Sequence, residues 1–215
     1  MVKYTCKNRL TVITYYCEVN IMDKRKNDTK ERIIQSVIND ISQNGYDNIS
    51  LRDVAKKHNI TATALYKHFQ GKDDLMNIVL AEVSHIVYKL YRTRKKDFGI
   101  DTTPKDDLLI IGKSILNMFA EKPLLMDFLF FSPYALSTYQ DMEDLNTPFS
   151  LLKEYKILIG QFVDEYNLAT DAKTLFIKLW SFIQGYSLLV TNKVVNYDEK
   201  LLESTLNDII GGRNR

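Results

Sequence analysis

Residues 50–75, SLRDVAKKHNITATALYKHFQGKDDL, contain two short helical patterns with almost no chain between them. Each pattern is defined by apolar residues that share one helical face: Leu51, Val54 and Ala55 in the first, and Ala64, Leu65 and Phe69 in the second. Only residues 57–60 lie between the two patterns. Two helices joined this closely have to cross steeply, which predicts a helix-turn-helix.

Four positions in this segment meet the packing requirements of such a unit. Ala55 is small, as it must be where the second helix crosses over the first. Asn59 lies in the turn, where a positive φ is expected, and Asn tolerates that conformation best after Gly. Ile60 and Leu65 are apolar and can fill the wedge between the helices. The alternative is an ordinary helical hairpin with no role in DNA binding, and the combination of all four positions favours the helix-turn-helix.

The second helix of this unit, expected from Thr61 to Phe69, has the side chains that a DNA-reading helix needs. In a helix-turn-helix this helix enters the major groove, with its N-terminal residues nearest the base edges. Its exposed side presents hydroxyl, methyl and cationic groups suited to base edges: Thr61, Ala62, Thr63, Lys67 and His68. Residues around this helix are placed for the phosphate backbone: Tyr66 and Lys72 beside it, and Ser50 and Arg52 at the start of the preceding helix.

The charge distribution agrees with a nucleic-acid partner for the first half of the chain. Residues 1–100 contain 18 Lys and Arg against 11 Asp and Glu, a net charge of +7. Residues 101–215 contain 11 against 16, a net charge of −5. A basic first half predicts a polyanion as the partner of that half alone, although solvated charges distributed by chance would give the same totals.

Residues 45–75, GYDNISLRDVAKKHNITATALYKHFQGKDDL, closely resemble the DNA-binding region of the tetracycline-repressor (TetR/AcrR) family of bacterial transcriptional regulators. The matching motifs are Gly45-Tyr46, Leu51-Arg52-Asp53-Val54-Ala55, Asn59-Ile60-Thr61, and Leu65-Tyr66-Lys67-His68-Phe69 with Lys72 and Leu75. Asn59 replaces the usual Gly of the turn. The resemblance covers about residues 29–80, and no motif beyond them matches residue by residue.

The resemblance implies a homodimer that binds a palindromic double-stranded DNA operator and has a C-terminal ligand-binding domain. In the family, residues that match Tyr66 and Lys72 contact phosphates, and the position of Arg52 contacts DNA in some members. The family also implies dimerisation through the C-terminal helices. Residues 175–190 fit that role, because they are apolar on more than one helical face and Gly185 allows a close approach.

Helical periodicity and sparse punctuation predict an all-α fold of about nine or ten helices. The chain has only 8 Gly and 4 Pro among its 215 residues. The expected helices cover about residues 29–44, 50–58, 61–69, 72–96, 104–119, 123–131, 147–166, 170–192 and 198–210. We divide the chain into an N-terminal extension (1–22), a three-helix helix-turn-helix DNA-binding domain (23–72), and a helical effector-binding and dimerisation domain (73–215).

The second half is rich in aromatic residues, which by default form a core. Six residues are our candidates for a pocket that binds a small apolar or aromatic effector: Phe119, Phe128, Phe131, Tyr134, Trp180 and Gln184. The expected outcome is a repressor that the effector releases from its operator. The alternative is a DNA-binding regulator controlled by a protein partner or by no ligand, which would show no closed apolar cavity.

The remaining sequence features argue against other classes of protein. No apolar stretch reaches the ~18 residues that span a bilayer, and no secretory signal is recognisable, so we expect a cytoplasmic protein without membrane contact. The three His are scattered and no catalytic motif occurs, so we expect no metal, no cofactor and no enzyme activity. Residues 1–21, with Cys6 and Cys17, are either an extension upstream of a start at Met22 or an arm whose basic residues contact phosphate.

Overall fold

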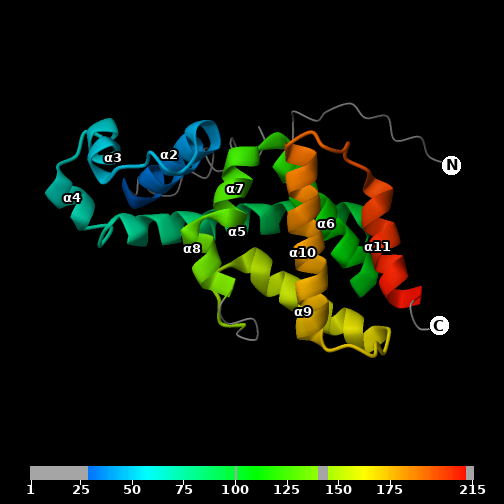
Figure 1. Ribbon diagram of the computed structural model, residues 1–215. Helices are drawn as coiled ribbons and strands as arrows, with labels where there is room; N and C mark the ends of the chain where they lie inside the picture. The colour runs from blue at the N-terminus through cyan, green and yellow to red at the C-terminus, as the bar shows by residue number, and fades with distance from the viewer. Residues whose placement is uncertain (1–28, 100, 140–144, 212–215) are drawn as a thin grey trace. The chain divides into compact units, whose positions relative to one another are not determined.

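The computed structural model describes residues 29–99, 101–139 and 145–211, and all the regular structure in these ranges is helical. The prediction of an all-α fold is therefore confirmed. The elements are α2 (Thr29–Asn44), α3 (Leu51–Lys57), α4 (Ala62–Tyr66), α5 (Lys72–Phe98), α6 (Pro104–Glu121), α7 (Pro123–Phe131), α8 (Pro133–Leu136), η1 (Ser137–Tyr139), α9 (Ser150–Glu165), α10 (Ala172–Thr191) and α11 (Glu199–Gly211) (Figure 1). Both accounts of residues 1–21 concern a segment outside the described residues.

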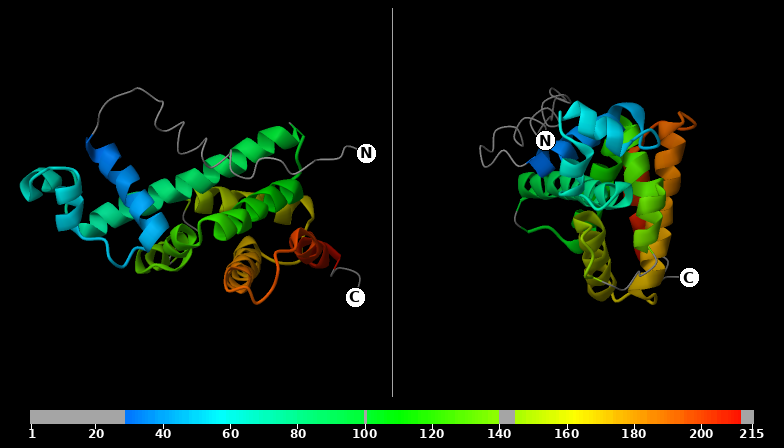
Figure 2. Two further views of the ribbon diagram at one scale, coloured as in Figure 1. Left: turned by 90° about the horizontal axis from the view of Figure 1, so that it is seen from above. Right: turned by 90° about the vertical axis from the view of Figure 1, so that its left-hand side faces the viewer.

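The helix-turn-helix and the C-terminal helices belong to one structural unit, residues 33–215. The 27-residue helix α5 runs from the α3–α4 pair into the C-terminal helices, where it packs against α6 and α9 (Figures 1 and 2). Helices α10 and α11 both pack against α6. The boundary that we placed after residue 72 thus falls at the first turn of a helix that serves both regions.

Several helix ends lie where their capping residues predict. Thr103 forms a capping box with Asp106: its hydroxyl accepts from the Asp106 N–H at 3.2 Å, and its own N–H donates to Asp106 Oδ2 at 3.0 Å. Two helices begin slightly later than predicted. Helix α10 is capped by Asp171, which accepts from the Thr174 N–H at 2.8 Å, and not by Thr170. Helix α9 begins at Ser150 instead of near Thr147.

The start of α9 has a tertiary cause. Its N-cap residue Phe149 has no polar side chain to bind the first-turn amides. The Leu151 N–H donates instead to Ser84 Oγ of α5 at 3.1 Å, and His85 Nδ1 lies 3.3 Å from Ser150 Oγ. An amide left without a partner at a helix start is costly, so the hydroxyl from α5 fixes where α9 begins.

Three helices end in the same hydrogen-bonded turn, with a residue other than Gly in the left-handed region. These residues are Asn59 after α3 (φ 53°), Asn167 after α9 (φ 43°) and Lys193 after α10 (φ 58°). At Asn59 the residue's own N–H donates to Lys56 O at 3.1 Å, and the Ile60 N–H donates to Ala55 O at 3.0 Å. This pair of bonds is the Schellman motif, which satisfies carbonyl groups that the helix leaves without partners.

Helix α11 is held against α6 by a close approach and by polar contacts. A Cβ atom at Gly112 of α6 would lie 2.9 Å from Leu202 Cδ2 of α11. Lys113 pairs with Glu199, and Lys105 Nζ donates to Asn207 Oδ1 at 2.6 Å. Glycine at position 112 therefore lets the buried Leu202 side chain pack directly on the α6 backbone.

Candidate nucleic-acid interface

The crossing of α3 and α4 is built as the sequence predicts. Ala55 and Leu65 are buried at the crossing, and Asn59 has the positive φ that the turn requires. Ile60 is half-buried and, with Leu51 and Tyr66, lines an open groove between the two helices. One prediction needs correction: α4 itself covers only Ala62–Tyr66. After Tyr66 the chain tightens, because the His68 N–H donates to Leu65 O in a three-residue turn.

Most of the predicted DNA-binding residues face solvent. Arg52, Thr61, Ala62, Thr63, Tyr66 and Lys67 are exposed, and Ser50, His68 and Lys72 are half-buried. The Tyr66 side chain is 57% exposed, so its ring is not a core group. Tyrosine in this position can combine van der Waals contact with a hydroxyl hydrogen bond to phosphate. The structure thus brings these side chains to the outer surface of the α3–α4 pair and its flanks.

Two of the predicted hydroxyl groups already cap helices. Ser50 Oγ accepts from the Asp53 N–H at 3.2 Å and lies 2.6 Å from Asp53 Oδ2, to which it donates. Thr61 Oγ1 accepts from the Ala64 N–H at 3.1 Å. The Thr61 cap uses the oxygen as acceptor, so its hydroxyl hydrogen can point toward a DNA acceptor. The Ser50 hydrogen can do so only by leaving Asp53.

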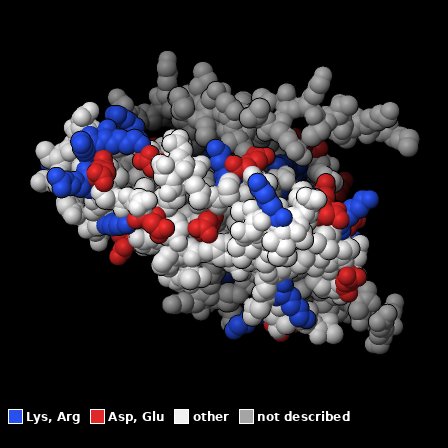
Figure 3. All heavy atoms as spheres, turned by 45° about the horizontal axis from the view of Figure 1, so that its top comes forward, with Lys and Arg blue, Asp and Glu red and all other residues white. Residues whose placement is uncertain are grey.

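The acidic residues near this surface are turned toward partners within the protein. Asp40 binds Lys57 Nζ at 2.6 Å and so ties α2 to α3. Asp74 accepts from the Gln70 N–H at 2.8 Å and caps the start of α5. Asp73 accepts from the Tyr134 hydroxyl at 3.4 Å. Lys and Arg side chains gather at the end that carries α3 and α4 (Figure 3). The surface can therefore attract a polyanion despite the carboxylates beside it.

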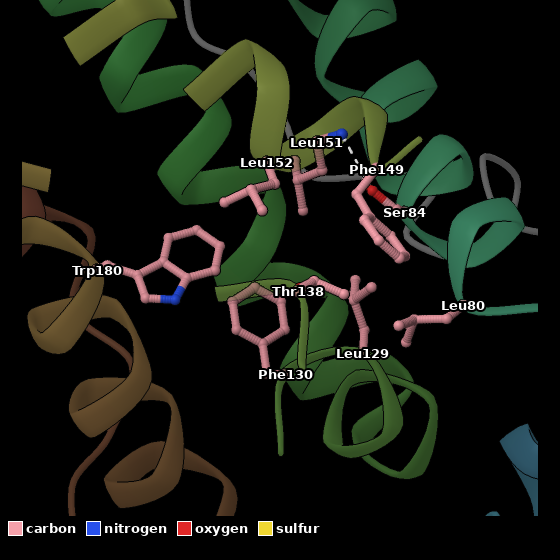
Figure 4. A pocket seen from close by; sticks show the side chains of 9 residues that line it. All are labelled: Leu80, Ser84, Leu129, Phe130, Thr138, Phe149, Leu151, Leu152 and Trp180. Carbon is pink, nitrogen blue, oxygen red and sulfur yellow. Dashed lines mark hydrogen bonds between the residues drawn. The ribbon is translucent and has the colours of Figure 1, made fainter. Parts of the chain in front are cut away.

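The C-terminal helices line a small, partly open apolar cavity between α5, α7, α9 and α10 (Figure 4). It is lined by Leu80, Ser84, Leu129, Phe130, Thr138, Phe149, Leu151, Leu152 and Trp180. Trp180 lies at one end and stacks on Phe130 with ring centroids 5.0 Å apart, and Leu80 and Ser84 lie at the other end. The cavity holds about 20 Å³, which is room for one water molecule.

Of the six predicted effector residues, Trp180 lines this cavity and the others lie elsewhere. Phe119 and Phe131 pack against Phe130 behind the lining, at 5.2 Å and 6.3 Å between ring centroids. Phe128 and Tyr134 lie in contact with each other at 6.3 Å, on the side of α7 and α8 that meets the helix-turn-helix. Gln184 is half-buried on α10.

Four of the eight lining residues that we did not predict are leucines, whose sequence pattern does not distinguish a cavity wall from a core. Leu129 and Phe130 belong to the apolar run LLMDFLFF, which the sequence identified as a buried helix without indicating which side faces a cavity. No charged side chain lines the cavity. It suits an uncharged group, and pockets for drug-sized ligands need several hundred Å³, so such a ligand has to displace side chains.

Two further properties concern only the residues that the structure describes. Within them, no three or more His, Cys, Asp or Glu residues are grouped in a way that could hold a metal ion. Nor is any of their helices both long enough and apolar enough to cross a membrane.

The fold and this surface define a helix-turn-helix DNA-binding protein with an additional helical domain. A sequence model of the bacterial regulatory proteins of the tetR family matches residues 38–79. The chain is 26% identical over 187 residues to the biofilm operon icaADBC HTH-type negative transcriptional regulator IcaR of Staphylococcus aureus (strain Newman), in a match that covers 79% of this chain and 94% of the relative.

Solved structures show the same fold. A TetR-family transcriptional regulator from Haemophilus influenzae Rd is similar with a TM-score of 0.53 and 17% identity, over 84% of this chain and 93% of that chain. The multidrug binding protein EbrR, complexed with imidazole, is similar with a TM-score of 0.57 and 17% identity, over 86% and 96%. The chain thus matches the tetR family over its helix-turn-helix region, and over most of its length it shares the fold of these solved structures.

Proposed function

We propose that this regulator is a cytoplasmic homodimer that represses transcription from a palindromic operator and is released by a small apolar or aromatic effector. The observation that carries the DNA-binding part is the exposure of Thr61, Thr63 and Lys67 on and at the ends of α4, together with the exposed Arg52 and Tyr66. The name of the Staphylococcus aureus relative, a negative transcriptional regulator, supports repression over activation.

In this proposal α4 lies in the major groove and its flanks contact the backbone. Thr61, Ala62, Thr63, Lys67 and His68 read base edges. Residues around them contact phosphates: Ser50, Arg52, Tyr66 and Lys72. Phosphate contacts supply affinity for any sequence, and base contacts supply the preference for one sequence.

The second subunit packs against an exposed apolar stripe on α10. Ile177, Leu188 and Leu189 are between 43% and 49% exposed. Ser181 and Gly185 lie between them at helical spacing, and a Cβ at Gly185 would have no atom within 4 Å. A stripe with large apolar ends and a small centre lets another helix approach closely. The same stripe on α10 of a second copy of the chain can pack against it and bury both.

The effector enters the cavity between α5 and α10 and enlarges it. Leu80 and Ser84 of α5 are part of its lining, so enlargement tilts α5, which leads directly into the helix-turn-helix. A coupling free energy of ~1–3 kcal/mol would lower operator affinity ~5–150-fold. The small volume of the cavity favours a second candidate, a regulator that responds to a protein partner or to no ligand.

A selection of bound fragments from random DNA tests the proposal. The expected product is a palindrome that binds with a strong dependence on salt. Thr63→Ala and His68→Ala should change the preferred bases more than the general affinity. Equal losses of affinity on the selected palindrome and on random DNA would show that these two side chains do not read bases. Enrichment of no sequence would reject operator binding as a whole.

A further inference from the structure

We propose that α7 transmits the state of the cavity directly to the helix-turn-helix, with Phe128 as a positioning residue that holds the turn before α3 through Tyr46. This inference rests on the proposed function and adds a route of regulation to it. The tilt of α5 acts on the chain that follows α4. The contact of Phe128 acts at the opposite end of the helix-turn-helix, on the chain that precedes α3.

The contact itself is a pair of aromatic rings from the two regions. Phe128 of α7 is fully buried, and its ring centroid lies 5.6 Å from that of Tyr46, with 44° between the planes. Tyr46 follows Gly45, which is in the left-handed conformation (φ 77°) at the end of α2. The Ile49 N–H donates to Tyr46 O at 3.3 Å, in a turn that ends at the N-cap of α3. A displacement of the Tyr46 ring is therefore passed through a short hydrogen-bonded turn to the start of α3.

The two residues after Phe128 belong to the cavity wall. Leu129 and Phe130 both line the cavity, and Phe130 stacks directly on Trp180, which also lines it. Helix α7 has only nine residues, begins with Pro123, and is followed by a second short helix whose N-cap Ser132 accepts from the Ala135 N–H at 3.2 Å. A short helix bounded in this way moves as a rigid body. Outward pressure on Leu129 and Phe130 therefore also displaces Phe128.

Helix α8 provides a second contact with the DNA-binding region. The Tyr134 ring lies 6.3 Å from Phe128, and its hydroxyl donates to Asp73 Oδ1 at 3.4 Å. Asp73 lies in the first turn of α5, next to Lys72, which is a proposed phosphate contact. The pair α7–α8 thus touches the chain on both sides of the α3–α4 unit, before α3 and after α4.

Charges beside the ring pair oppose the contact. Asp47 follows Tyr46, and Asp127 precedes Phe128. Partial burial, and then the nearby Asp47 carboxylate, raise the pKa of Asp127 above its usual value. When both carboxylates are charged, their repulsion opposes the aromatic contact. A contact balanced in this way is easily shifted by a modest push from the cavity.

A larger side chain can replace the unidentified effector in a test. Leu152 of α9 lines the cavity and belongs neither to the Phe128–Tyr46 pair nor to the proposed DNA-binding residues. Leu152→Trp overfills a space of about 20 Å³ and should press the cavity walls apart. We expect the dissociation constant for the selected palindrome, measured by fluorescence anisotropy, to rise about five-fold or more. In a Tyr46→Leu background the same substitution should raise the dissociation constant by a clearly smaller factor, because the ring contact is absent and only the tilt of α5 remains.

Controls separate this inference from a folding defect and from the proposed function. Tyr166→Leu removes one ring of the Phe162–Tyr166 pair (4.8 Å) at the C-terminal end of α9, which is not part of the Phe128–Tyr46 contact. The full effect of Leu152→Trp should therefore persist in that background. Leu151→Phe is a milder substitution in the cavity wall, to be used if circular dichroism shows that Leu152→Trp does not fold.

If Leu152→Trp raises the dissociation constant by the same factor in the wild-type and Tyr46→Leu backgrounds, α5 alone transmits the change and the inference is overturned. No effect of either folded cavity variant on affinity would also overturn it, because the cavity would then not communicate with the DNA-binding surface. If the wild-type protein itself does not bind the selected palindrome, the proposed function fails instead.

Discussion

The left-handed residue in the turn of the helix-turn-helix should set operator affinity as well as stability. Asn59 and Asn167 have the same conformation, φ 53° and 43°, and the same pair of Schellman hydrogen bonds. One ends α3 within the DNA-binding unit, and the other ends α9 far along the chain. Alanine at either position keeps the helix but places a Cβ-bearing residue without an Asn side chain in the left-handed region. Asn167→Ala is therefore a matched control for Asn59→Ala.

The expected magnitudes follow from the cost of that conformation. A residue with a Cβ is strained by roughly 1–2 kcal/mol in the left-handed region, and Asn relieves part of this strain by local hydrogen bonding. Both variants should therefore lower the free energy of unfolding by about 1 kcal/mol, or the melting temperature by about 2–4 °C for a chain of this size. Because the Asn59 turn fixes the angle of α4, relaxation of the strained turn in the free protein must be reversed on DNA. Strain that the free protein relaxes lowers affinity, and strain that it keeps lowers stability, so about 1 kcal/mol in each subunit is the upper limit for affinity. This limit corresponds to at most roughly 30-fold weaker binding by a dimer.

Urea denaturation and anisotropy titration on the selected palindrome measure the two effects separately. Asn59→Ala should lose both stability and affinity, Asn167→Ala should lose stability alone, and Asn59→Gly should retain affinity because Gly adopts a positive φ without strain. The reasoning is refuted if Asn59→Ala loses stability and still binds the palindrome as tightly as the wild type. In that case the turn does not determine how α4 is presented.

Three further predictions concern phosphate contact, the α6–α11 packing and alkaline pH. Lys72→Ala should weaken binding to all sequences alike and flatten the slope of log K against log[salt] by about one unit per subunit, whereas alanine at the exposed Lys153 of α9 should leave the slope unchanged. Gly112→Ala places a Cβ 2.9 Å from a Leu202 methyl group and should displace α11 from α6. We therefore expect a lower melting temperature and, because the C-terminal helices form the proposed dimer, weaker dimerisation in sedimentation experiments. Unchanged dimerisation would show that α11 adapts. Burial, and then Glu199, raise the pKa of Tyr197 to about 12. As pH rises, the Tyr197 hydroxyl therefore ionises first in the unfolded chain, and the free energy of unfolding falls above about pH 10. Tyr197→Phe should reduce that fall in urea titrations, and an unchanged fall would show that the pKa of Tyr197 is not raised by folding.

The helix-turn-helix could be predicted from the sequence because its determinants are local. A small residue at Ala55, a turn residue that accepts positive φ at Asn59 and an apolar Leu65 lie within a few residues of one another, and the structure has each as expected. The capping box at Thr103 is local for the same reason. Each of these features depends on backbone geometry that is determined by residues close in sequence.

The cavity could not be predicted because tertiary contacts define it. Helix α9 begins at Ser150 because a hydroxyl from Ser84 binds its first-turn amide across 67 positions of sequence, and this contact brings Leu151 and Leu152 to the cavity. Phe128 and Tyr134 are aromatic, as the residues of an apolar ligand pocket often are, yet they contact Tyr46 and Asp73 of the DNA-binding region. Aromatic content indicates burial, whereas the identity of the neighbour depends on how the helices pack.

The short length of α4 limits how many base pairs one subunit can contact. The five residues of α4, at 1.5 Å each, extend about 7.5 Å, roughly two base-pair steps of 3.4 Å. Among the ~10⁶–10⁹ competing positions in a genome, so few base pairs recur far too often to mark one promoter. The distance between the two α4 helices of a dimer, fixed by the joined C-terminal helices, would then contribute much of the operator specificity. Inserting or deleting base pairs at the operator centre should therefore lower affinity as much as changing the contacted bases.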